Sequence, residues 1–147
     1  KDPFNKETPR PFNARSETIM EKKLFKGSWM YKRCLIPASG FFEKGHRICR
    51  KDQQPFWLGA IWSRWMSPEG SELESCSILT TQPNELIQPL HNRMPVIIPN
   101  ELEEEWMVSI KDATELKALE PILNGWSPDE WVAEAMNSKD SSQMSLF

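Results

Sequence analysis

The middle of the chain carries short apolar runs separated by turn residues, a pattern that predicts β-strands. Residues 33–43 predict a short strand, a turn or bulge, and a second strand. Residues 54–62 and 75–81 are rich in aromatic, β-branched and small side chains and predict two further strands, with a turn at Ser67-Pro-Glu-Gly70 between them. The apolar run from Met94 to Ile98 predicts a short buried strand.

Helix-start signals lie mainly toward the two ends of the chain. A serine cap predicts a short helix over residues 16–23, and one helical turn is expected over 84–89. Capping-box-like signals predict helices over 100–108 and 112–119, and the Ser-Pro-Asp-Glu run at 127–130 is an equally good local start. Strands in the middle with helices at the ends indicate an α+β fold rather than alternating βαβ units.

The length of the chain indicates a single domain. Its 147 residues can bury one sizeable core but not two. The longest apolar run, residues 56–62, is too short to cross a bilayer, which needs about 20 residues. The chain opens on Lys1-Asp-Pro-Phe-Asn5, without an initiator Met and in the style of a loop, so we expect an upstream segment to be missing from this sequence.

Cysteine usage favours a reducing, cytoplasmic setting. The three cysteines are widely spaced and contain no Cys-x-x-Cys motif, which argues against a disulfide framework. With only His46 and His91 available and no metal-ligand spacing, no metal and no cofactor are expected. Two of the cysteines lie within apolar strands without a neighbouring base in sequence, and the set is therefore expected to be unreactive: Cys34, Cys49 and Cys76.

Charge is distributed unevenly between the two halves of the chain. The net charge of −3 argues against coating nucleic acid through bulk charge, but a local basic face remains possible. Two solvated faces without any partner explain the charges equally well. The basic residues of the first half are Lys22, Lys23, Lys26, Lys32, Arg33, Lys44, Arg47, Arg50 and Lys51, and the acidic residues of the second are Glu101, Glu103, Glu104, Glu105, Asp112 and Glu115.

Glu43 is the first candidate for chemistry. It follows small and aromatic residues, so partial burial is expected, and burial raises the pKa of a carboxyl toward values that suit a proton shuttle near neutral pH. The alternative is a carboxylate at a strand end that pairs with Lys44 or Arg47. Several tryptophans also fit a sheet core, although an exposed one could stack on an unpaired base; these are Trp57, Trp62 and Trp65.

Two further segments carry polar side chains among apolar neighbours. His91 can donate or accept a proton, and Arg93 two residues later can anchor an anion. Asn13 and Arg15 alternate about Ala14, so an extended backbone would turn both toward one ligand, for which a phosphate is well suited. The alternatives are structural: a histidine that only satisfies hydrogen bonds, and an asparagine in a helix-entry loop.

Four motifs in this order and spacing resemble the SRAP family, the SOS-response-associated, abasic-site-processing proteins that are also described as peptidases. The resemblance covers most of residues 10–110 and is looser in the acidic C-terminal third, where the family pattern suggests a strand around Trp131 in place of a helix. The motifs are Asn13-Ala-Arg-Ser-Glu-Thr18, Arg33-Cys-Leu-Ile-Pro-Ala-Ser-Gly-Phe-Phe-Glu43, Ile78-Leu-Thr-Thr81 and His91-Asn-Arg-Met-Pro-Val-Ile-Ile98.

The resemblance implies a compact, β-barrel-like antiparallel core with flanking helices and a positively charged groove. It implies binding of single-stranded DNA at abasic sites and a covalent thiazolidine cross-link through an N-terminal Cys. By motif, Asn13 would orient that Cys and the sugar, Glu43 would shuttle protons, and His91 would assist sugar-ring opening or reversal. Arg15 and Arg93 would hold flanking phosphates. No membrane or metal partner is implied, and the expected location is cytoplasmic, on the nucleoid when DNA is bound.

Two departures from the family pattern leave alternatives open. The Met-Cys-Gly-Arg opening of the family is absent from residues 1–147, and Lys44 stands where the family usually has a base-stacking Trp. Without the N-terminal Cys this chain cannot form the thiazolidine. The alternatives to a DNA cross-linking protein are a self-processing cysteine peptidase that uses the same residues, and a binding module for DNA or protein without chemistry.

Overall fold

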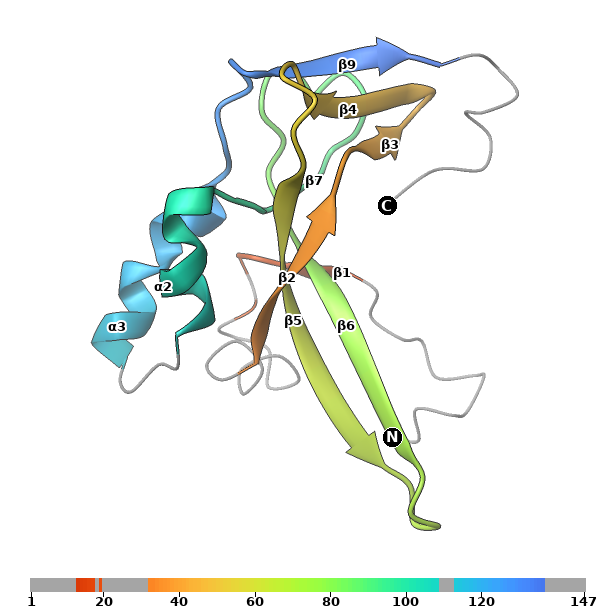
Figure 1. The fold of residues 1–147 in the computed structure, drawn as a ribbon, viewed down its shortest axis with the longest axis vertical. Helices are drawn as coiled ribbons and strands as arrows, with labels where there is room; N and C mark the ends of the chain where they lie inside the picture. The colour runs from red at the N-terminus through yellow and green to blue at the C-terminus, as the bar shows by residue number, and fades with distance from the viewer. Residues whose placement is uncertain (1–12, 18, 20–31, 109–112, 137–147) are drawn as a thin grey trace.

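The computed structural model describes residues 13–17, 19, 32–108 and 113–136, which form two β-sheets and a group of short helices (Figure 1). The main sheet has the order β1-β6-β5-β2, with β7 paired to β6 and β8 to β5, and the second sheet has the order β3-β4-β9. The main strands are β1 (Asn13–Arg15), β2 (Arg33–Ala38), β5 (Phe56–Met66), β6 (Glu72–Thr81), β7 (Met94–Pro95) and β8 (Ile97–Ile98), and the others are β3 (Phe41–Glu43), β4 (His46–Arg50) and β9 (Trp131–Ala135).

A long antiparallel hairpin, β5–β6, is the axis of the main sheet. Its register runs from Ala60 opposite Ile78 to Met66 opposite Glu72. The predicted turn between the strands is confirmed: the Ser67 N–H donates to the carbonyl of Ser71 at 2.7 Å. In Figure 1 the hairpin extends well past the rest of the described chain.

At the other end of the hairpin, β5 and β6 separate and the segment β7–β8 lies between them. Val96 connects both sides, since its N–H donates to the carbonyl of Leu79 at 2.8 Å and its carbonyl accepts from Gly59 at 2.9 Å. The single strand expected over 94–98 is therefore two short pairings to different neighbours. Gly59 allows this close approach, because a Cβ there would lie 3.0 Å from the end of the Ile98 side chain, which would have to shift.

The second sheet contains two strands that the sequence pattern did not predict from local signals. β3 and β4 form a hairpin closed by Lys44 and Gly45, both with positive φ (42° and 76°), as in a two-residue type I′ turn. β9 pairs with β4, which confirms the strand suggested by the family pattern around Trp131. The local helix start at 127–130 is not used, because pairing to β4 and burial of the Trp131 ring outweigh capping propensity.

Two hydrophobic clusters cover the two faces of the main sheet. One lies against the helices and includes Leu79, Val96 and Trp106. The other lies between the two sheets and includes Phe41 and Ile78. The main sheet is thus sandwiched between a helical layer and the smaller sheet.

The helical layer consists of short elements held onto the sheet by side-chain hydrogen bonds. Arg33 donates through Nε to the carbonyl of Trp106 at 2.8 Å and through Nη2 to the carbonyl of Val108, while the Trp106 indole donates to the carbonyl of Cys34 at 2.9 Å. The elements are η1 (Asn100–Leu102), α2 (Glu103–Met107), α3 (Ala113–Ala118) and η2 (Glu120–Asn124). Helices are thus confirmed in both regions predicted after residue 100.

The α+β expectation is confirmed, and within the described residues the strands form two separate sheets that do not close into a barrel. The helix expected over 16–23 falls mostly outside the described residues; Ser16, Glu17 and Ile19 lie in turns. None of the helices that the structure describes is long and apolar enough to cross a membrane.

Candidate active site and nucleic-acid interface

The C-terminal end of β6 gathers three of the candidate segments around Thr80. β1 runs parallel to β6 with Arg15 opposite Thr80, and the Ser16 N–H donates to the Thr80 carbonyl at 2.8 Å. Ala14 is buried in the core while Arg15 is exposed, as the predicted alternation requires. Position 13 pairs with Ile78 in the backbone register, and the Asn13 side chain lies outside what the structure describes.

Arg93 is buried, and its guanidinium is fixed on Thr80. Nε donates to the Thr80 hydroxyl at 3.3 Å, and Nη2 donates to the hydroxyl at 3.1 Å and to the carbonyl at 2.8 Å. Nη2 also forms an ion pair with Oε2 of Glu17 at 2.8 Å. Burial would raise the pKa of Glu17, but the hydrogen bond and charge of Arg93 outweigh that effect and hold the pKa below its ordinary value.

His91 follows a tight turn that is anchored on Ile87. The Ile87 carbonyl accepts from the N–H groups of Leu90 at 2.7 Å and of His91 at 2.9 Å. The Asn84 side chain fixes the start of the turn, because its Oδ1 accepts from the Ile87 N–H at 3.1 Å. On the other side the Arg93 N–H donates to Nδ1 of His91 at 3.0 Å, so the half-buried ring is held by the backbone on both sides.

Glu43 ends β3 and is 2% exposed, which agrees with the expected burial. Phe41 lies two residues earlier on the same face of the strand and belongs to the cluster between the sheets, together with Ile78 and Met94. Of the two partners considered for the carboxylate, Arg47 contacts the Ser39 carbonyl at 2.9 Å and Glu134 at 3.8 Å.

The structure therefore sets Arg15 opposite Thr80 in the backbone register and joins Arg93, with His91, to the same residue of β6. Glu43 lies on the face of β3 that carries Phe41, which packs in the layer between the sheets. Sequence reasoning did not assign roles to Thr80 or Glu17, which tie these segments together. Both lie inside the family motifs. The sequence signal for Thr80 is a hydroxyl within a β-branched strand, and the signal for Glu17 is a carboxylate two residues after Arg15.

The position where the family usually has a Trp lies at the tip of the β3–β4 hairpin, and Lys44 is exposed there. Of the tryptophans considered for base stacking, Trp57 packs against the core next to the helices, as expected for a core residue. Trp62 is half-buried with the Lys32 ammonium 5.1 Å from its ring centroid, a cation–π contact. The Trp65 side chain lies outside what is described.

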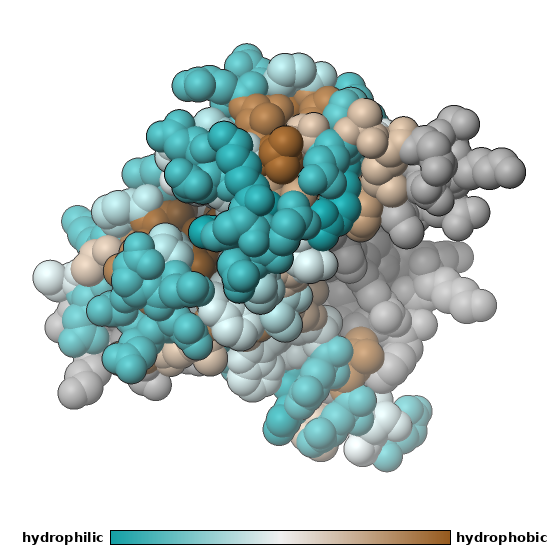
Figure 2. Space-filling view, turned by 45° about the horizontal axis from the view of Figure 1, so that its top comes forward, coloured by the Kyte–Doolittle hydropathy of each residue, from teal (hydrophilic) through white to brown (hydrophobic). Residues whose placement is uncertain are grey.

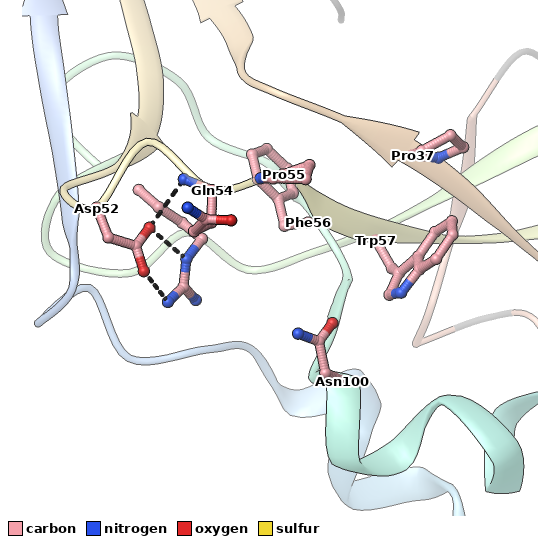
Figure 3. A pocket seen from close by; sticks show the side chains of 8 residues that line it. Pro37, Asp52, Gln54, Pro55, Phe56, Trp57 and Asn100 are labelled. Atoms are coloured by element: carbon pink, nitrogen blue, oxygen red, sulfur yellow. Dashed lines mark hydrogen bonds and ion pairs between the residues drawn. The ribbon is translucent and has the colours of Figure 1, made fainter.

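A pocket of about 450 Å³ lies apart from these residues, where β2 and β5 meet η1 (Figure 3). Arg50 and Asp52 form a bidentate ion pair at its rim, at 3.0 and 2.7 Å, which lowers the pKa of Asp52 to about 2. None of the five candidate residues lines it; the lining residues are Pro37, Arg50, Asp52, Gln54, Pro55, Phe56, Trp57 and Asn100. The face in Figure 2 is mostly hydrophilic, with small apolar patches between polar groups.

Cys34 and Cys76 reach toward each other from β2 and β6, with 3.7 Å between their sulfur atoms, and all three cysteines are free thiols. Burial, together with the neighbouring Cys76 thiol, raises the pKa of Cys34 to about 12. Among the residues that the structure describes, no group of three or more His, Cys, Asp or Glu side chains could hold a metal ion.

The model of the family named SOS response associated peptidase (SRAP) matches residues 1–139 of the chain. The chain belongs to the SRAP family. "Abasic site processing protein YoqW" of Bacillus subtilis is 37% identical over 135 residues, covering 86% of this chain and 59% of that protein. "Abasic site processing protein YedK" of Escherichia coli is 33% identical over 121 residues, covering 75% of this chain and 54% of that protein.

Solved structures share the fold of this chain. A crystal structure of a protein from Bacteroides thetaiotaomicron superposes with a TM-score of 0.77 at 32% identity, covering 86% of this chain and 59% of that one. A second, from Bordetella bronchiseptica, has a TM-score of 0.74 at 26% identity, covering 85% and 64%. A vertebrate relative, "Abasic site processing protein HMCES" of Xenopus tropicalis, is 28% identical over 146 residues, covering 76% of this chain and 42% of that protein. The chain thus spans roughly half the length of these curated relatives.

Proposed function

We propose that this SRAP chain is the main body of an abasic-site processing protein that binds single-stranded DNA and cross-links to abasic sites through an N-terminal Cys. Its membership of the family supports this, as do the names of its curated relatives. In this proposal residues 1–147 belong to one domain, and a Met-Cys-Gly-Arg opening supplies the nucleophile. The DNA would be reached in the cytoplasm, at the nucleoid.

The observation that carries the proposal is the grouping of Arg15, His91 and Arg93 on Thr80. The exposed Arg15 lies opposite Thr80 in the parallel β1–β6 pairing. The buried Arg93 guanidinium binds Thr80, and the Arg93 peptide N–H binds the half-buried His91 imidazole. Nε and Nη2 of Arg93 are held on Thr80 and Glu17, and in this proposal Nη1 would donate to a phosphate oxygen.

The proposed chemistry proceeds in two bond-forming steps at the sugar aldehyde. The α-amine of the N-terminal Cys attacks C1 of the ring-opened sugar, and loss of water from the carbinolamine gives a Schiff base. The Cys thiol then adds to the same carbon, which closes the thiazolidine. Glu43 would carry protons between the amine and the departing water, and His91 would assist opening of the sugar ring. Asn13 would orient the Cys and the sugar.

A denaturing gel tests the proposal directly. The test uses the cross-linking form, which is the protein extended at its N-terminus so that it opens on Met-Cys-Gly-Arg, with the Met removed to leave the α-amine of Cys free. This form is incubated with single-stranded DNA that contains one abasic site. We expect a protein–DNA band that survives denaturation, and expect it to disappear when the N-terminal Cys is replaced by Ser. Intact single-stranded DNA of the same sequence is the matched control. Absence of a covalent band with the abasic DNA would contradict the proposal.

Two other functions give different results in the same experiment. A self-processing peptidase, which the family name suggests, would shorten the protein in the absence of DNA. A binding module without chemistry would retain DNA in a salt-sensitive manner and give no covalent product. The exposed Lys44 at the hairpin tip favours weaker distortion of the DNA than a Trp wedge would cause, under either DNA-binding alternative.

A further inference from the structure

We propose that His91 acts as a hydrogen-bond donor through Nε2, in a tautomer that the Arg93–Thr80–Glu17 network fixes. This inference rests on the proposed function, for which it names the group that His91 supplies. It makes Thr80 and Glu17 positioning residues, and it separates the role of His91 from that of a general base.

The contacts of the imidazole carry the argument. A backbone N–H can only donate, so the Arg93 N–H at 3.0 Å requires a lone pair on Nδ1 of His91. A neutral ring that accepts at Nδ1 carries its proton on Nε2. In that state Nε2–H can stabilise negative charge that develops on a sugar oxygen, but Nε2 has no lone pair with which to remove a proton.

The carbonyl oxygen of Arg93 is the second atom near Nδ1, and it would replace the Arg93 N–H as the partner of Nδ1 if the His91 ring became charged. Nδ1 also lies 3.2 Å from the Arg93 carbonyl oxygen, which could accept a proton placed on Nδ1. The Arg93 N–H would then face another donor, so the charged ring loses its 3.0 Å hydrogen bond. The 3.0 Å contact from the Arg93 N–H to Nδ1 thus favours the tautomer that carries its proton on Nε2.

The Arg93 peptide can direct its N–H at the ring because its side chain is fixed at the far end. Three hydrogen bonds join the guanidinium to Thr80, which is 3% exposed, and Glu17 adds an ion pair at 2.8 Å. On the other side of His91, the turn is tied to the Ile87 carbonyl. Loosening the Thr80 end should therefore free the Arg93 peptide and allow both neutral tautomers.

The first test is the nitrogen NMR spectrum of the imidazoles in the chain as it stands, at about pH 8.5, where ordinary imidazoles are neutral. The chain has only two histidines, and His46 is an internal reference. Its Nδ1 lies 3.0 Å from the Lys44 carbonyl, an acceptor, so His46 should carry its proton on Nδ1. We expect the opposite tautomer for His91, and a His91 ring protonated on Nδ1 would overturn the proposal.

Thr80→Val then tests the network, since it removes only the hydroxyl and keeps the shape and β-branching. We expect the His91 resonances to move toward a mixture of tautomers while His46 is unchanged, and Glu17→Gln to act in the same direction more weakly. Ser63→Val is the matched control, because its exposed hydroxyl contacts the hydroxyl of Ser75 on the β5–β6 hairpin, away from Thr80. A pure Nε2–H ring in Thr80→Val would remove Thr80 and Glu17 from the positioning role.

Amide substitutions test the donor role in the cross-linking form. The amide nitrogen of Gln can occupy the place of Nε2, whereas that of Asn corresponds to Nδ1. A donor role predicts that His91→Gln keeps the cross-linking rate within about 10-fold and that His91→Asn falls further, whereas acid–base catalysis predicts a loss of about 10²-fold or more in both. Thr80→Val should cause no further loss of cross-linking rate in the His91→Gln background.

Equal losses of rate in His91→Gln and His91→Asn would overturn the donor role. Absence of cross-linking in the unsubstituted protein would contradict the proposed function alone, since the NMR result stands apart from it.

Discussion

The hydroxyl and carbonyl oxygens of Thr80 join β6 to Ser16 and to Arg93. The carbonyl accepts from the Ser16 N–H and from Arg93, the hydroxyl accepts from Arg93 twice, and the residue pairs with Pro95 of β7. A buried hydroxyl or carbonyl without such partners would cost roughly 1–3 kcal/mol. Arg93 and Thr80 therefore stabilise each other, and the geometry of His91 follows from their contact.

Glu43 gives a prediction on activity without loss of the fold. Glu43→Gln keeps the shape of the side chain and removes only its ability to exchange a proton. In the cross-linking form we expect covalent product to form about 10²-fold more slowly or worse, with a nearly unchanged thermal midpoint. Glu134→Gln, on the exposed side of β9, should leave the rate unchanged. A Glu43→Gln protein that cross-links at the parent rate would remove Glu43 from the proton path.

The Cys34–Cys76 contact gives a prediction on thiol reactivity. Because the pKa of Cys34 is raised to about 12, its thiolate is scarce near neutral pH, and we expect iodoacetamide to modify the exposed Cys76 long before Cys34. Modification of Cys34 should accelerate steadily as the pH rises toward 12. In Cys76→Ser the pKa of Cys34 should fall only in part, since burial is the larger cause. Peptide mapping by mass spectrometry measures both rates, and rapid labelling of Cys34 at pH 7 would contradict this prediction.

At the level of elements, local sequence signals predicted the strands whose pattern is self-contained and missed those that depend on a partner. The β5–β6 hairpin follows from its aromatic and β-branched runs and the turn between them. β9 required knowledge that β4 lies beside it, because Ser127-Pro128 alone favours a helix. The split pairing of β7 and β8 depends on the separation of β5 from β6, which no local pattern reports.

The turn after β1 gives a prediction on acid stability. The pKa of Glu17 is depressed in the folded chain by Arg93, so its contribution to folding is present above the unfolded pKa near 4.5 and is lost as the pH falls through the lower folded value. We expect the unfolding free energy of the unsubstituted chain to exceed that of Glu17→Gln at pH 7 and the difference to shrink below about pH 4.5. Urea titrations across that range measure it. If the difference in unfolding free energy between the two proteins stays constant down to pH 2, the Glu17–Arg93 ion pair is not its cause.

At the scale of the molecule, part of the candidate site could be foreseen and part could not. Motif spacing indicated Glu43, His91 and Arg93, and their burial or hydrogen bonding fits residues with a specific task. The role of Glu17 as the partner of Arg93 could not be foreseen, because the two lie far apart along the chain and only the parallel pairing of β1 with β6 brings them together. Long-range pairing of this kind leaves no periodic trace in sequence.

The uneven charge of the chain predicts that DNA binding depends on a few cations rather than on net charge. Arg15 is exposed and lies opposite Thr80 in the β1–β6 pairing. Arg64 lies on the β5–β6 hairpin, in an ion pair with Glu74 at 2.8 Å. For single-stranded DNA each lost phosphate contact lowers the slope of log affinity against log salt by about 0.7. We expect Arg15→Ala to reduce the slope by about that amount and Arg64→Ala to leave it unchanged. Fluorescence anisotropy between 50 and 200 mM salt, roughly the range in which such contacts are resolved, measures both. Equal salt slopes for the two variants would place the DNA away from the C-terminal end of β6, because DNA bound at that end must pass Arg15.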